Sequence, residues 1–286
     1  MDKNLKTKIK NIFLDLDGTT LTSNKEISQK TISILKKMQK EGKTVSIVTG
    51  RPVYFAKEEY YKLNCDFPII GCNGALVYDF KNDKLVYKNP INKNISEQIF
   101  QLLVKNNITF LMYTTSEIYG YSRENYQADW FNWLKSSIEK REKQFQFNLT
   151  ILNSKTKNDF DIKKFDIVKF LVIKSDSQEK DIENIKPELT KFQGVYIIQS
   201  QEKVIDIMPE GSSKGYALEV LSKTNNFNLE ETLVFGDEQN DVSMFEVAKY
   251  SVAMGQSKDV IKEKATFITD SNNDEGIFNF INKYLK

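Results

Sequence analysis

The chain has 286 residues, 40% hydrophobic and 28% charged, which is enough to bury the core of one large or two ordinary globular domains. Its 41 basic and 39 acidic residues are mixed along the sequence, so no charged patch predicts a nucleic-acid or membrane partner, and we expect a small-molecule partner. Two cysteines and no histidine exclude a disulfide scaffold, histidine-ligated metals and Ser-His or Cys-His triads. Proton transfer must then fall mainly to carboxylates, lysine or tyrosine.

The sequence offers no sign of a membrane segment. It has no apolar run of about 18 residues that could cross a bilayer. The segment 1–10 is too polar for the apolar region of a signal peptide. We therefore expect a cytoplasmic protein, either a monomer or a small homo-oligomer.

Strand and helix patterns alternate over the first third of the chain, which predicts repeated βα units. Ser28 at an N-cap position and apolar residues at helical spacing predict a helix over 28–41, which Gly42 ends. Pro52 suits the first turn of the next helix. We expect strands at 10–16, 44–48, 68–72 and 75–78, with Asn73 and Gly74 as the turn between the last two.

The pattern changes between about residues 88 and 208, where aromatic residues, including Trp130 and Trp133, are frequent. Longer helices mix there with strands that look antiparallel, so we expect an inserted α+β domain over 88–208. The polar stretch 148–161 is expected to be an exposed loop. The expected helices are 96–105, 126–139 and 178–192, and the expected strands are 108–113, 166–173, 195–198 and 204–207.

The βα pattern returns in the last part of the chain, 209–286. Strands are expected at 232–235 and 251–253, and helices from about 241 and over about 275–284. The fold class we predict is therefore α/β. Residues 1–87 and 209–286 would form one Rossmann-like core domain, with a doubly wound parallel sheet that the insertion interrupts.

Two aspartates directly follow the first apolar strand, in the sequence Asp15-Leu16-Asp17-Gly18-Thr19. Ligands of parallel sheets bind beyond the carboxyl ends of the strands, so Asp15 lies at an expected active-site edge. Gly18 permits a sharp turn, and paired carboxylates repel each other unless a proton or a cation lies between them. A metal ion is the natural candidate, although a solvated strand-to-loop turn gives the same pattern.

Two further segments could bind a phosphate group at this edge. Thr49, Gly50 and Arg51 follow the second strand, where the hydroxyl and the backbone amides could hold a phosphate oxygen; an ordinary helix start gives the same pattern. Lys214 lies at the N-terminus of a predicted helix, where the helix dipole disfavours a cation unless an anion is near. A solvated surface lysine is the alternative.

Three acidic residues and an amide follow the strand 232–235, namely Asp237, Glu238, Asn240 and Asp241. Oxygen ligands of this kind suit Mg²⁺, which prefers carboxylates, water and substrate phosphate. A helix N-cap at Asn240 or Asp241 would explain part of the cluster, but it would leave Asp237 unexplained.

These four segments, in this order, resemble the motifs of the haloacid dehalogenase superfamily of aspartate-nucleophile phosphohydrolases. The resemblance covers the chain from about residue 8 to the C-terminus. The sequence Asn73-Gly74-Ala75, the large insertion and the segment 209–215 resemble the Cof-type sugar-phosphatase branch, which has a type IIB α/β cap. Glu238 departs from this branch, which usually has glycine there.

The resemblance implies a Mg²⁺-dependent phosphatase of small phosphorylated metabolites, most of all sugar phosphates, that forms an aspartyl-phosphate. Asp15 would be the nucleophile, Asp17 the general acid and base, and Lys214 the third catalytic residue. Asp15, the backbone carbonyl of Asp17, Asp237 and Asp241 would hold the metal. The substrate-binding residues would be Thr49, Gly50, Arg51, Asn73, Gly74 and Asn240.

Two other classes of protein fit the same motifs. A phosphotransferase or phosphomutase would pass the phosphoryl group from Asp15 to a sugar instead of to water. A non-catalytic phospholigand sensor would be expected to have lost Asp15, Asp17 or Lys214. All three residues are present, so we rank this class last.

Overall fold

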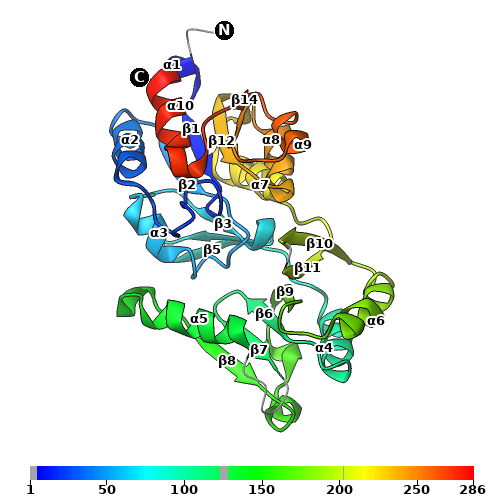
Figure 1. Cartoon of the computed structure of the whole chain (residues 1–286). Coiled ribbons are helices and arrows are strands. Elements are labelled where there is room, and N and C mark those ends of the chain that lie inside the picture. The colour runs from blue at the N-terminus through cyan, green and yellow to red at the C-terminus, as the bar shows by residue number, and fades with distance from the viewer. Residues whose placement is uncertain (1–4, 123–127, 202) are drawn as a thin grey trace. The chain divides into compact units, whose positions relative to one another are not determined.

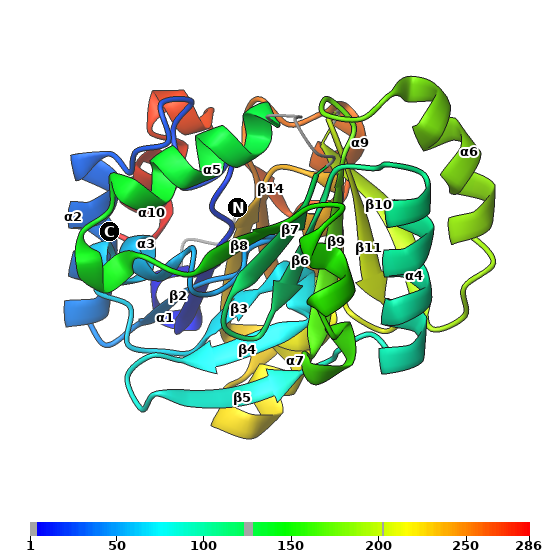
Figure 2. The ribbon, with the colours of Figure 1, turned by 90° about the horizontal axis from the view of Figure 1, so that it is seen from below.

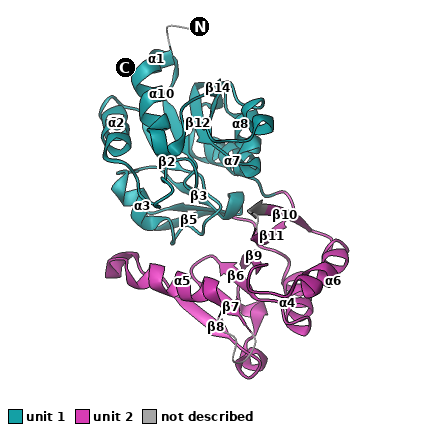
Figure 3. Ribbon diagram, viewed as in Figure 1, with its two compact units in different colours: residues 1–87, 212–286 teal, residues 88–211 magenta. Residues whose placement is uncertain are grey.

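The computed structural model describes residues 5–122, 128–201 and 203–286 (Figure 1). The chain divides into two compact units (Figure 3). The first comprises residues 1–87 and 212–286, and the second comprises residues 88–211. The chain therefore leaves the first unit once and later returns to it.

The first unit is built on a parallel sheet with the strand order β14-β13-β12-β1-β2. Every residue of β1 and β12 is buried, as expected for central parallel strands that are covered on both faces. This confirms the predicted α/β core. The strands are β1 (Asn11–Leu14), β2 (Thr44–Ile47), β12 (Thr232–Gly236), β13 (Tyr250–Ala253) and β14 (Phe267–Ile268).

Helices cover this sheet on both sides. On one face, Leu218 of α7 and Met244 of α8 pack with Phe13 and Val234 of the central strands. Helices α2 and α10 pack together (Figure 1), and Ser28 is the N-cap of α2 as expected. The helices are α1 (Leu5–Lys8), α2 (Gln29–Lys40), α3 (Lys57–Lys62), α7 (Lys214–Asn225), α8 (Val242–Val247), α9 (Asp259–Lys262) and α10 (Gly276–Tyr284).

A smaller sheet, β3-β4-β5, continues the first unit beyond β2. An isolated parallel bridge between Val48 and Ile70 links the two sheets. Strands β3 and β4 are antiparallel, and the turn between them contains Asn73 (φ 51°) and Gly74 (φ 91°), as predicted. The strands are β3 (Ile69–Gly71), β4 (Leu76–Asp79) and β5 (Lys84–Lys88).

The second unit has a six-stranded sheet with the order β10-β11-β9-β6-β7-β8. Helices α4 and α6 lie on one face over an apolar cluster that includes Phe110 and Phe170 (Figure 2). Phe131 of α5 packs near Gly120 and Leu111 on the opposite face. The elements are α4 (Lys93–Lys105), β6 (Phe110–Thr114), β7 (Ile118–Tyr121), α5 (Asp129–Glu139), β8 (Leu149–Leu152), β9 (Ile167–Ile173), α6 (Glu179–Leu189), β10 (Val195–Gln201) and β11 (Val204–Pro209).

The expectation of a loop over 148–161 was wrong in part, because Leu149–Leu152 form β8, which pairs in parallel with β7. Strands β5, β7 and β14 were not predicted. Strands β5 and β8 do contain apolar residues, but each is a run of only four or five residues flanked by polar ones, which is too short for a periodic pattern to show. The predicted helix 126–139 begins outside the described residues, and α5 is described from Asp129.

One close helix contact positions the start of α7. A Cβ atom on Gly215 would lie 2.1 Å from the backbone oxygen of Ser243, at the start of α8. The Gly215 amide donates a hydrogen bond to the Ser243 hydroxyl at 3.1 Å. A side chain at position 215 would push α7 away, and Lys214 with it.

We therefore expect Gly215→Ala to destabilise the protein by about 1–3 kcal/mol, the usual cost of overpacking a buried contact. Urea-induced unfolding measures this free energy. Lys223→Ala, at an exposed position of the same helix, is the control and should change stability by less than about 0.5 kcal/mol. Equal stability of the two variants would contradict the close contact.

Candidate active site

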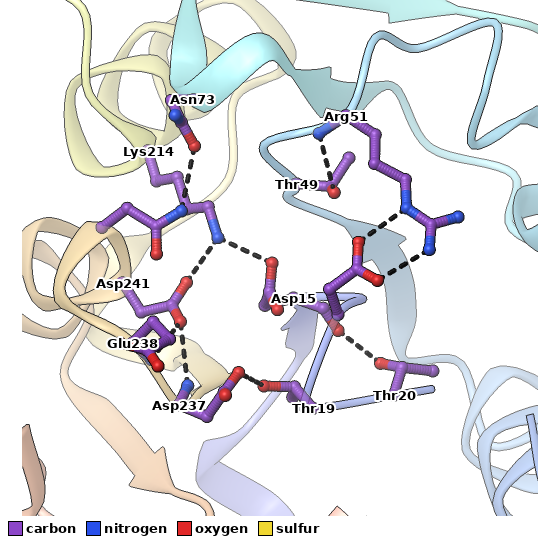
Figure 4. Close-up of polar contacts among 12 residues, drawn as sticks. Asp15, Thr19, Thr20, Thr49, Arg51, Asn73, Lys214, Asp237, Glu238 and Asp241 are labelled. Atoms are coloured by element: carbon purple, nitrogen blue, oxygen red, sulfur yellow. Dashed lines mark hydrogen bonds and ion pairs between the residues drawn. The ribbon is translucent and has the colours of Figure 1, made fainter. Parts of the chain in front are cut away.

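The site residues of the first unit come from the carboxyl ends of three adjacent strands. Asp15 follows β1, Asp237 follows β12, and Thr49 follows β2. The Asp15 amide continues the ladder by donating to the carbonyl of Phe235 at 3.0 Å. Because parallel strands end on the same edge, these side chains converge (Figure 4).

Lys214 lies at the centre of this edge, with 1% of its side chain exposed. Its ammonium nitrogen is 2.6 Å from Oδ1 of Asp15 and 2.5 Å from Oδ1 of Asp241 (Figure 4). The residue is the first of α7, whose N-cap is Ser213. The two carboxylates provide the anionic charge that makes a lysine favourable at this helix end.

Asp241 is fixed by the loop that precedes it. Its Oδ2 accepts hydrogen bonds from the backbone amides of Asp237 (2.8 Å) and Glu238 (3.0 Å). The backbone of Glu238 is extended (φ −123°), a conformation open to any residue, and its side chain is exposed. Glutamate in place of the glycine usual in the resembling branch is therefore accommodated without backbone strain.

Asp237 lies against the loop after β1. Oδ1 of Asp237 accepts a hydrogen bond from the Thr19 hydroxyl at 2.7 Å. Gly18 has φ +84°, and a Cβ atom there would lie 2.2 Å from Oδ2 of Asp237. The absence of a side chain at Gly18 thus leaves room for the carboxylate beside Asp15.

Asp15, Asp237 and Asp241 form a three-carboxylate cluster in which one oxygen of each lies within 4.8 Å of the others. All three residues are buried. The oxygen ligands and their spacing fit a divalent cation such as Mg²⁺. The side chain of Asp17 is not part of this cluster.

Burial and mutual repulsion shift the pKa values of this cluster. Burial, opposed by the charge of Lys214 but reinforced by Asp241 and Asp237, raises the pKa of Asp15 well above its usual value. Burial and the nearby Asp241 raise the pKa of Asp237 to about 7. Burial opposes the charged form of Lys214, but Asp15 and Asp241 outweigh it and raise the pKa of the lysine. The single ammonium group of Lys214 does not balance three ionised carboxylates, which together with burial is why Asp15 and Asp237 bind protons more readily than exposed aspartates do.

Asp17 is held by two cations. Arg51 contacts both carboxylate oxygens, with Nε 2.6 Å from Oδ2 and Nη2 2.7 Å from Oδ1. The ammonium group of Lys25 lies 2.8 Å from Oδ1. Burial alone would raise the pKa of Asp17, but the charges and hydrogen bonds of Arg51 and Lys25 lower it well below its usual range.

The remaining expected binding residues form a second group at the same edge. The amide nitrogen Nδ2 of Asn240 donates to Oδ1 of Asn73 at 3.0 Å, and the backbone amide of Asn73 donates to the Thr49 carbonyl at 3.1 Å. Nδ2 of Asn73 is buried and has no hydrogen-bond partner among the residues that the structure describes. A Cβ atom on Gly50 would lie 2.9 Å from Oδ1 of Asn73, and one on Gly74 would lie 2.0 Å from the carbonyl oxygen of Ser213.

An unpartnered buried donor is costly unless a ligand accepts from it, so Nδ2 of Asn73 is suited to an anionic oxygen.

Three residues that contact site residues were not predicted from the sequence, namely Thr19, Lys25 and Glu59. Thr19 lies two residues after the Asp-x-Asp motif and so could have been named. Lys25 and Glu59 carry no local pattern, because their roles arise only from the folded chain.

Comparison with known proteins gives one consistent family. The family model described as haloacid dehalogenase-like hydrolase matches residues 12–281. A putative phosphatase of Mycoplasma genitalium is 33% identical, covering 97% of this chain and 99% of the relative. A 5-amino-6-(5-phospho-D-ribitylamino)uracil phosphatase of Bacillus subtilis is 30% identical, covering 97% and 98%. Among solved structures, a haloacid dehalogenase-like hydrolase from B. subtilis has a TM-score of 0.79 at 26% identity, covering 97% and 100%.

The chain therefore belongs to the haloacid dehalogenase-like hydrolases, as its motifs predict. Within that family it is a phosphatase of the Cof type. In the part of the chain that the structure describes, every helix is too short or too polar to span a membrane.

We expect Mg²⁺ and protons to compete for the carboxylate oxygens of the three-carboxylate cluster. Since Asp237 has a raised pKa, the folded metal-free protein binds more protons than the unfolded chain between about pH 4 and 7, and its stability falls as the pH rises through this range. Mg²⁺ binds the same oxygens and should reverse this loss. Thermal unfolding should therefore show a larger Mg²⁺-induced rise in Tm at pH 8 than at pH 5.

The stabilisation at pH 8 should reach about 2.7 kcal/mol when Mg²⁺ is present at 100 times its Kd. Asp237→Asn serves as the control, because it removes one ligand charge and should reduce the effect of Mg²⁺. A rise in Tm that is independent of pH, or equal in the variant, would argue against binding at the three-carboxylate cluster.

Proposed function

We propose that this phosphatase hydrolyses small phosphorylated metabolites, sugar phosphates above all, with Mg²⁺ and through an aspartyl-phosphate on Asp15. The observation that carries the proposal is the placement of Asp15. Its buried carboxylate lies at the carboxyl end of the interior strand β1, 2.6 Å from the Lys214 ammonium group and within the three-carboxylate cluster. The B. subtilis relative named for a phosphoribityl compound supports the substrate class.

In the first step, an Asp15 oxygen attacks phosphorus and the bond to the leaving oxygen breaks. Asp17 donates a proton to that oxygen and later takes one from the attacking water. Because Arg51 and Lys25 hold the pKa of Asp17 low in the free protein, the negative charge of the bound phosphoryl group must raise this pKa before Asp17 can carry the proton. The free carboxylate then returns on Asp15 and inorganic phosphate leaves. Lys25 and Arg51 bind the carboxylate of Asp17, which exchanges a proton in both steps of the reaction.

Charge spreads over the phosphoryl oxygens in the transition state, so fixed donors contribute most there. We assign this binding to Lys214, Thr49, Asn73 and Asn240. The unpartnered Nδ2 of Asn73 supports the assignment. Bound Mg²⁺, held by Asp15, Asp237 and Asp241, would shield the nucleophile from the anionic substrate. Selection of the leaving group would fall to the inserted unit, residues 88–211.

The two N-terminal aspartates should fail in different ways. Asp15→Asn should abolish turnover, because no carboxylate remains to form the acyl phosphate. Asp17→Asn should still react with an ester of a good leaving group, which needs little protonation, but should hydrolyse the intermediate slowly. Rapid-quench mass spectrometry should then find one phosphoryl group on the Asp15 peptide. Label on a serine or threonine, or on the Asp15→Asn protein, would contradict the assignment.

The substrate class is tested by a phosphate-release screen over many phosphorylated metabolites. We expect turnover of small phosphate esters with Mg²⁺ and none after metal removal by a chelator. Release without any acceptor sugar separates a phosphatase from a phosphotransferase. Undiminished hydrolysis by protein shown to be metal-free would exclude the Mg²⁺ requirement, and activity only on addition of a sugar would favour the transferase.

A further inference from the structure

A line of three ionic side chains leads away from the catalytic edge. Arg51 binds both oxygens of Asp17 on one side, and its Nη1 lies 3.1 Å from Oε1 of Glu59 on the other. The side chains of Arg51 and Glu59 are only 14% and 10% exposed. The Arg51 guanidinium also lies over the ring of Phe55, 5.0 Å from its centre.

This geometry differs from the role that the resemblance implies for Arg51. A substrate-binding arginine would present its guanidinium to the phosphate ester, whereas three of its nitrogens here contact protein carboxylates. A bidentate arginine fixes the plane of a carboxylate, as a lysine does not. Arg51 therefore orients the group that we assign to proton transfer.

Glu59 is a buried carboxylate in contact with the guanidinium group of Arg51. It lies in the six-residue helix α3, where its neighbour Glu58 instead pairs with Lys62 at 3.5 Å at the more exposed surface. Burying a carboxylate costs free energy unless an opposite charge compensates it. Arg51 provides that charge, and Glu59 in turn fixes the far end of a long, flexible side chain.

We propose that Glu59 is a positioning residue for the phosphatase reaction, acting on Asp17 through Arg51. The proposal rests on the proposed function, in which Asp17 is the general acid and base. Without Glu59 the guanidinium loses one of its anchors, and the Asp17 carboxyl is held less firmly where it meets the leaving oxygen. Asp15 and the three-carboxylate cluster are not part of this line, so attack on phosphorus is retained.

The loss should therefore depend on the leaving group. An alkyl phosphate, such as the best substrate from the screen, needs a proton on its leaving oxygen, whereas p-nitrophenyl phosphate needs little. For Glu59→Ala we expect kcat/KM to fall on the order of ten-fold on the alkyl ester, the usual effect of losing a partner that orients a reactive group. On p-nitrophenyl phosphate the fall should be less than about two-fold. Glu59→Gln, whose amide oxygen can still accept from Nη1, should recover part of the activity.

Glu58→Ala is the matched control on the same helix and should leave both substrates unaffected. The decisive measurement is a double-mutant cycle with Asp17→Asn. If Glu59 acts only through Asp17, adding Glu59→Ala to Asp17→Asn changes nothing further on either ester. A merely structural role would give an additional, equal loss on both. Thermal unfolding monitors folding, and Glu59→Gln decides the question if Glu59→Ala does not fold.

The proposal would be overturned if Glu59→Ala lowered kcat/KM equally on the two esters or on neither. It would also be overturned if the losses of Glu59→Ala and Asp17→Asn added up in the double variant. Failure of the proposed function is seen separately, in Asp17→Asn alone. If that variant loses kcat/KM equally on both esters, Asp17 is not the leaving-group acid, whatever Glu59→Ala does; kcat is not compared, because slow hydrolysis of the shared intermediate lowers it on both esters. If Asp17→Asn loses more kcat/KM on the alkyl ester than on p-nitrophenyl phosphate, but Glu59→Ala loses equally on both, only the role of Glu59 is overturned.

Discussion

The catalytic edge depends on one buried charge contact, that of the Lys214 ammonium group with Asp15 and Asp241. Three carboxylates from two neighbouring strands converge where water is largely excluded, and each would otherwise repel the others. Lys214 balances only part of this charge. Burial first, and this remaining negative charge second, raise the pKa values of Asp15 and Asp237. The same excess of negative charge suits the cluster to a divalent cation.

The position of Lys214 depends in turn on backbone geometry on both sides of it. Gly215 lets α7 approach the backbone of Ser243, and the turn at Gly74 lies against Ser213. Asp241 is fixed by two backbone amides, so its carboxylate meets the lysine from a rigid loop. A preorganised site of this kind spends little free energy on rearrangement when charge develops on a substrate.

The sequence predicted the parts of this molecule whose burial is periodic. Strands β1 and β12 each contain three consecutive apolar residues, and Ser28 marks the start of α2 in the way N-caps do. Strands β5 and β8 were missed because each is a run of four or five residues in a polar stretch of the chain. At the site, the aspartates and Lys214 were named from local motifs. The contact of Arg51 with Asp17 and Glu59 was not foreseen, since spacing along the chain does not say which carboxylate an arginine meets.

The strand order also bears on how the chain is made. β1 lies inside its sheet, between β12 and β2, yet its parallel partner β12 lies 221 residues later, as in the pair Asn11 and Thr232. At a synthesis rate of about 5–20 residues per second, roughly 10–45 s separate the emergence of the two strands. During that interval β1 can pair only with β2, and the apolar edge that awaits β12 is bare. The nascent protein therefore presents an aggregation-prone strand while the whole inserted unit is translated, which makes it a natural client for chaperones.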